Sequence, residues 1–146
     1  MYANLDHLCR FSTKAAIDAL AIRFNLPNIR GMQDWAYEVA DANRIDEYLA
    51  AYDSGELSHD EKFTLMAMLL QSFWDAIDEG KSFLQITWKH FLDLLERDID
   101  IHIYLVWYWS SVDKPEADIE NPDYMFSISP FIRPILLRHQ GKFARH

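Results

Sequence analysis

The chain has 146 residues, of which half are hydrophobic and 14% aromatic, and its formal net charge at pH 7 is -9. This length predicts a single domain over residues 1–146, large enough to bury a sizeable core. With only four glycines, the composition argues against a turn-rich β-sandwich, and the apolar runs are too short to span a bilayer.

The first part of the chain carries helical patterns. FSTKAAIDALAIRFNLPN offers Ser12 as an N-cap and good helix formers, with an expected end at Asn25 ahead of Pro27. MQDWAYEVA predicts a short helix capped by Asp34. Both segments favour an α-helical fold.

Two further segments carry their own start or stop signals. DANRIDEYLAAYDSG can begin with Asp41 or Asn43 as the cap, and SHDEKFTLMAMLLQSFWDAIDEG begins with Ser58 and Glu61 in a capping box. Gly80 stands where a left-handed residue is expected to end the second helix. The first helix is expected to bury a stripe formed by Ile45, Tyr48, Leu49 and Tyr52, and the second a stripe formed by Phe63, Met66, Leu70, Phe73, Trp74 and Ile77.

The segment FLQITWKHFLDLLERD predicts a helix with one apolar face, and IDIHIYLVWYW after it permits two interpretations. As a strand, residues 99–109 alternate and could pair with 124–129 in a hairpin; as a helix, they are apolar on nearly every face, as in a central buried helix. An isolated two-stranded ribbon is marginal, so we favour the helix. The apolar face of the preceding helix is formed by Leu84, Trp88, Phe91, Leu92 and Leu95.

SSVDKPEADIENPDY predicts a loop, because it contains two prolines and no apolar periodicity. SISPFIRPILLRH then predicts a helix with Ser129 as the N-cap, Pro130 at its first position and a kink at Pro134. The expected fold is therefore an all-α bundle of about six to seven helices. The alternative is an α+β fold with one small hairpin from 99–109 and 124–129.

Signals for catalysis are few. The six histidines form no i, i+4 pair, His7 and Cys9 fall short of zinc spacing, and no glycine-rich phosphate loop or GxSxG motif occurs. We therefore expect no metal, no cofactor and no enzymatic activity. The alternative is a small enzyme at a buried polar cluster formed by Asp100, His102, Tyr104 and Arg133.

Charge is distributed unevenly along the chain. Residues 1–30 sum to +2 and residues 124–146 to +4, whereas residues 31–123 sum to -15. Such a field repels nucleic acid and anionic membranes and attracts basic proteins. One interpretation is that a basic protein partner binds the acids of the loop, which are Asp113, Glu116, Asp118, Glu120 and Asp123. The alternative is that the acidic surface only keeps the domain soluble.

Four segments carry a resemblance to a known group: MQDWAYEVADANRIDEYLAAY, LSHDEKFTLMAMLLQSF, HIYLVWYWSS and MFSISPFIRPIL. Together they resemble small acidic bacterial proteins with immunity functions in toxin–immunity systems, the setting of toxin–antitoxin pairs and contact-dependent inhibition. The resemblance implies a cytoplasmic binding protein without chemistry of its own. The acidic field suits, in addition, an inhibitor that neutralises a basic, nuclease-like toxin.

A cytoplasmic location is also expected from the residues themselves, because the chain starts without a signal-peptide pattern and its single thiol suits a reducing compartment. The aromatic run permits a third function, that of an adaptor module which dimerises. Both a monomer and a weak homodimer agree with the sequence.

Overall fold

The computed structural model describes residues 2–113 and 126–144, and these residues form seven α-helices, two short 3-10 helices and no strand. The all-α prediction is confirmed. The hairpin alternative is wrong, because residues 99–109 form a helix and a second helix begins at Ser129.

The chain divides into two compact units, each described here by itself. We call residues Phe11–Lys81 the α4 unit, and Met1–Arg10 together with Ser82–His146 the α6 unit. Each takes its name from the helix that its other helices contact. That the two units form a single domain stays a prediction.

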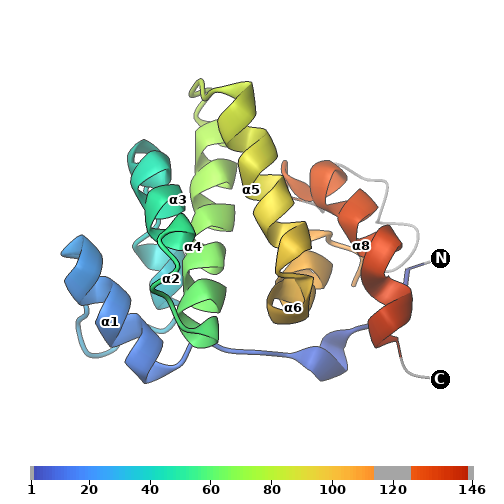
Figure 1. The fold of residues 1–146 in the computed structure, drawn as a ribbon, viewed down its shortest axis with the longest axis horizontal. Coiled ribbons are helices and arrows are strands. Elements are labelled where there is room, and N and C mark those ends of the chain that lie inside the picture. The colour runs from blue at the N-terminus through green and yellow to red at the C-terminus, as the bar shows by residue number, and fades with distance from the viewer. Residues whose placement is uncertain (1, 114–125, 145–146) are drawn as a thin grey trace. The chain divides into compact units, whose positions relative to one another are not determined.

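In the α4 unit, the helices α1, α2 and α3 all contact the long helix α4, as Figure 1 shows. The stripe predicted for α3 is confirmed, since all four of its residues are buried; in α4, Trp74 and Ile77 are half-buried and the other four are buried. The elements are α1 (Lys14–Phe24), α2 (Trp35–Glu38), η2 (Ala42–Arg44), α3 (Ile45–Asp53) and α4 (His59–Asp78).

In the α4 unit, side chains close in sequence cap the starts of α1, η2 and α4, whereas α2 and α3 have no side-chain cap. The capping box of α4 is confirmed: the Ser58 hydroxyl accepts from the Glu61 amide at 3.1 Å, and the Glu61 carboxylate accepts from the Ser58 amide at 2.9 Å. At α1 the cap is Thr13 rather than Ser12, because the backbone becomes helical at Lys14. Asn25 ends α1 in a left-handed conformation, as expected.

In the α6 unit, the helix α6 contacts η1, α5 and α8, and eight of its eleven residues are buried. Trp107 and Trp109 are among them, and Tyr108 is the exposed ring of the run. The helical interpretation of the aromatic run is confirmed, and two of its four rings, those of Trp107 and Trp109, are buried. The elements are η1 (Asp6–Leu8), α5 (Gln85–Arg97), α6 (Ile99–Trp109) and α8 (Ser129–Phe143).

The apolar face predicted for α5 is right in its centre and wrong at its start. Trp88, Phe91 and Leu95 are buried, whereas Leu84 is 71% exposed. Leu84 precedes the helix at its N-cap position, so helical periodicity does not place its side chain. Leu94, which the prediction omitted, is buried instead.

Candidate partner-binding surface

The predicted contact residues fall mostly outside the described part of the chain. Glu116, Asp118, Glu120 and Asp123 lie outside the described residues, and only Asp113 lies within them. Asp113 is exposed, four residues after the end of α6. The proposal that this segment binds a partner therefore stays a prediction.

The predicted buried polar cluster is not brought together. His102 is completely buried, whereas Asp100 is exposed and its carboxylate pairs with the Lys142 ammonium at 2.7 Å. Helix geometry explains the separation: residues 100 and 104 share one side of α6, and residue 102 points to the opposite side. Asp100 is thus no part of a buried cluster, and a substrate cannot reach His102 in this structure.

Tyr104 is half-buried on α6 and hydrogen-bonds with Cys9, an exposed residue of the N-terminal segment. Burial, reinforced by this hydrogen bond, raises the pKa of the Tyr104 phenol. The phenol is therefore neutral at physiological pH, which suits a structural contact between the N-terminal segment and α6 better than acid–base chemistry.

Arg133 belongs to a buried hydrogen-bonded network where α6 ends and α8 begins. Its Nε donates to the Ser110 carbonyl at 2.8 Å, and the Ser129 hydroxyl donates to the Trp109 carbonyl at 2.6 Å. The hydroxyls of Ser111 and Ser129 also bond each other at 3.0 Å. These contacts satisfy carbonyls at the end of α6, so the network holds two helices together. Ser129 bonds here rather than as the predicted N-cap of α8, a position that Ile128 takes.

The largest excess of charge among the described residues lies in the α4 unit. This unit contains 13 acidic and 6 basic residues, a net charge of -7, whereas the whole α6 unit sums to -2. None of the 13 acids is buried. We call nine of them, which are exposed, the acidic exterior: Asp34, Glu38, Asp46, Glu47, Asp53, Glu56, Asp60, Asp78 and Glu79.

The helices of the α4 unit direct these acids outward. On α3, the inward stripe is apolar, and Asp46 and Asp53 lie beside this stripe, where both are exposed. At α4, Asp60 lies in the first turn, where the helix dipole favours a negative charge. Asp78 lies in the last turn and Glu79 directly follows it, where the same dipole disfavours a negative charge.

Most basic groups of the α4 unit are already paired within it. Lys14 bonds Asp18 at 2.7 Å, and a bidentate pair joins Arg44 to Glu47 at 2.8 Å. Hydrogen bonding to Lys14 lowers the pKa of Asp18, and hydrogen bonding to Arg44 lowers the pKa of Glu47. These two acids are therefore ionised at neutral pH.

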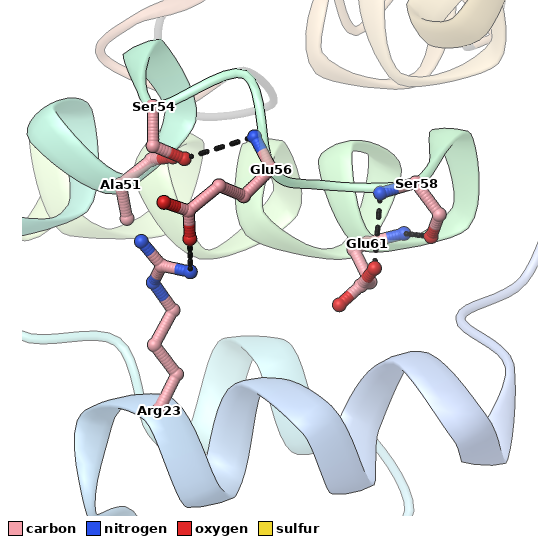
Figure 2. Close-up of polar contacts among 6 residues, drawn as sticks. All are labelled: Arg23, Ala51, Ser54, Glu56, Ser58 and Glu61. Carbon is pink, nitrogen blue, oxygen red and sulfur yellow. Dashed lines mark hydrogen bonds and ion pairs between the residues drawn. The ribbon is translucent and has the colours of Figure 1, made fainter.

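Figure 2 shows a third such pair, in which Arg23 of α1 reaches Glu56 in the connection between α3 and α4 at 3.1 Å. The Glu56 amide donates to the Ser54 hydroxyl, which itself donates to the Ala51 carbonyl. This turn fixes the connection that leads to Ser58 and the start of α4. Each of these bases is paired with one acid. The remaining acids therefore carry the net negative charge of the unit, and they lie at its surface.

The described residues contain neither a cluster of metal ligands nor a helix that could span a membrane. Across 2–113 and 126–144, no group of three His, Cys, Asp or Glu side chains could hold a metal ion. In the same part of the chain, no helix has both the length and the apolar character that crossing a membrane requires.

The acidic exterior was only partly foreseen from the sequence. The signal was the sum of -15 over residues 31–123, but the predicted site was restricted to the loop that follows α6. A comparison with known proteins adds no assignment: no family model, no curated protein and no solved structure matches the chain.

Proposed function

We propose that this protein is a non-enzymatic binding protein of the immunity type, which neutralises a basic, nuclease-like toxin in the cytoplasm by covering it with an acidic surface. The observation that carries the proposal is the α4 unit, whose 13 acids are all at least partly accessible and give it a net charge of -7. The four sequence segments that resemble small acidic bacterial immunity proteins support the same class of protein.

Electrostatics explains how such a surface would act. Exposed carboxylates are negatively charged and attract a cationic protein over distances of about one Debye length, roughly 8 Å at physiological ionic strength. Attraction of this kind raises the rate of association more than it lowers the rate of dissociation. An inhibitor that must reach its toxin before the toxin acts benefits from this fast association.

The end of α4 gives independent support. Negative charge at the C-terminus of a helix costs stability, and yet Asp75 and Asp78 lie in the last turn of α4, with Glu79 next to them. Lys81 compensates one of these charges, through its pair with Glu79 at 3.1 Å. Charges placed against the helix dipole are typical of residues kept for binding rather than for folding.

Co-expression tests the function directly. The protein should protect cells from the product of the neighbouring reading frame, and the purified pair should associate more slowly at 500 mM than at 50 mM NaCl. If the pair binds equally fast at both salt concentrations, the acidic surface does not steer the encounter. If cells gain no protection, the protein is not an inhibitor of that product.

Three matched double variants locate the surface, since each removes two negative charges. Asp46→Asn with Asp78→Asn changes the acidic exterior, Asp118→Asn with Asp123→Asn changes the predicted loop, and Asp6→Asn with Asp93→Asn changes exposed acids of the α6 unit. The first should slow association by about two- to fivefold, and the third should leave it nearly unchanged. If only the second variant associates more slowly, the binding surface is the loop and not the acidic exterior.

A further inference from the structure

The two halves of α8 are held in different ways. Every buried residue of this helix lies in its first half, Ser129–Leu136. Residues Leu137–Phe143 contain no buried residue. Apolar burial therefore fixes the first half, and other contacts must hold the second.

Those other contacts are polar and cationic. Arg138 donates two hydrogen bonds to the Glu96 carboxylate of α5, at 2.8 and 3.0 Å, and His139 Nε2 lies 2.7 Å from the same carboxylate. Lys142 pairs with Asp100 on the first turn of α6 at 2.7 Å. The Ala3 amide also donates to the Gln140 side chain, at 2.8 Å.

The helix itself is weak in this region. Gly141 lies inside the second half, where glycine costs about 1 kcal/mol relative to alanine. Pro134 lies inside the helix just before that half and offers no amide for the hydrogen-bond ladder. The second half thus depends on its side-chain contacts more than an ordinary terminal helix does.

We propose that Leu137–Phe143 is a detachable strap, which leaves α5 and α6 when the Glu96 and Asp100 contacts are weakened while Ser129–Leu136 stays packed. Opening separates three groups of α8, those of Arg138, His139 and Lys142, from two carboxylates. It therefore changes the distribution of charge that the α6 unit presents to a partner. This proposal does not depend on the identity of that partner.

The charged surroundings make the strap sensitive to salt and acid. Its pairs are partly exposed, with side-chain exposures of 34% for Glu96 and 71% for Asp100, so dissolved ions can screen them. The charged neighbours of Glu96 on α5 are Arg97, which pairs with Asp98, and Asp93. Protonation of Glu96 would remove the negative charge that Arg138 and His139 share.

Hydrogen exchange of the full chain tests the strap. We would compare the wild type with Glu96→Gln and with Asp93→Asn, which removes one exposed acid from the same helix and serves as the matched control. The amides of residues 139–144 should exchange about fivefold faster in Glu96→Gln, the factor expected for the loss of an exposed charged contact of about 1 kcal/mol. The same amides in the wild type should also exchange faster in 1 M NaCl.

The amides of residues 103–109 in α6 supply the internal reference, and their exchange should be the same in all three proteins. Equal exchange of residues 139–144 in Glu96→Gln and Asp93→Asn would overturn the proposal. Faster exchange of α6 together with the strap would overturn it as well, because the second half of α8 would then open only with the rest of the unit.

Discussion

The two units of this protein satisfy the ends of their helices by different means. In the α4 unit, Thr13, Asp41 and Ser58 accept hydrogen bonds from amides two or three residues ahead. In the α6 unit, none of α5, α6 and α8 has a side-chain cap of this kind. Ser129 and Arg133, about twenty residues further along the chain, instead bond the carbonyls that end α6.

This difference shows which parts of the fold depend on one another. A local cap stabilises its own helix, whether or not the rest of the chain is in place. The Trp109 and Ser110 carbonyls at the end of α6 accept from Ser129 and Arg133 only when α8 is packed against it, so this end of α6 depends on α8. Substitutions at the buried contacts between the end of α6 and α8 should therefore cost more than substitutions at local caps.

The largest effect is expected at Arg133. Arg133→Met keeps most of the length of the side chain but leaves the buried Ser110 carbonyl without its donor, which should lower the free energy of unfolding by about 2–3 kcal/mol. Arg138→Met, at an exposed arginine of the same helix, should cost less than about 1 kcal/mol. Urea unfolding measures both. Equal losses would mean that burial of the network contributes little.

A smaller loss is expected at the capping box of α4. Ser58→Ala removes the acceptor of the Glu61 amide and should cost about 1 kcal/mol. Ser82→Ala changes an exposed serine outside any helix and is the matched control. Thermal unfolding of the two variants should separate them by a few degrees. If Ser58→Ala costs as much as Arg133→Met, the contrast between local and long-range contacts fails.

The change in stability that protonation of Glu96 causes should be smaller again than the effect of Ser58→Ala. Hydrogen bonds from Arg138, and then from His139, lower the pKa of this carboxyl from 4.5 to about 2. Its contribution to stability is therefore complete above pH 4.5 and is lost as the pH falls towards 2. Because the group is partly exposed, we expect no more than about 1 kcal/mol.

Unfolding of the wild type and of Glu96→Gln between pH 7 and pH 2.5 measures this contribution. The difference between the two proteins should be largest at pH 7 and should shrink as acid is added. A difference that does not change with pH would assign the effect to packing rather than to charge.

The smallest effect is expected for Asn25→Gly, at the left-handed end of α1, where Asn25 has a φ of 53°. Asn25→Gly should change stability by less than about 0.5 kcal/mol, because glycine adopts this conformation without strain. Asn25→Val should cost about 1 kcal/mol or more, since a β-branched side chain is strained there. Denaturation midpoints of the two variants test this local ending, and equal midpoints would show that the left-handed turn is not maintained.

The sequence predicted the helices with clear ends and was less accurate where neighbours decide. Ser58, Glu61 and Asn25 were found from spacing alone, because a cap needs only residues of its own helix. Leu84 was placed on a buried face by periodicity, which carries no information on whether another element covers that position. His102 and Asp100 were grouped by their nearness in sequence, although the helix separates them.

For the candidate surface, the sequence supplied the charge and not its place. The sum of -15 over residues 31–123 was evident, but only the packing of α1, α2 and α3 on α4 decided which acids of that region face outward. The loop residues that were selected instead lie mostly outside the described part of the chain.

The sequence by itself determined that the chain is helical, where α4 begins and α1 ends, and that its net charge is strongly negative. These features depend on contacts between residues a few positions apart or on composition, which the sequence states directly. Only the tertiary structure decided that α6 ends against α8, that Arg133 is buried there, and that the second half of α8 is held by two carboxylates. Those features depend on pairs separated by 20 to 42 positions along the chain, and no local pattern specifies which distant residues will meet.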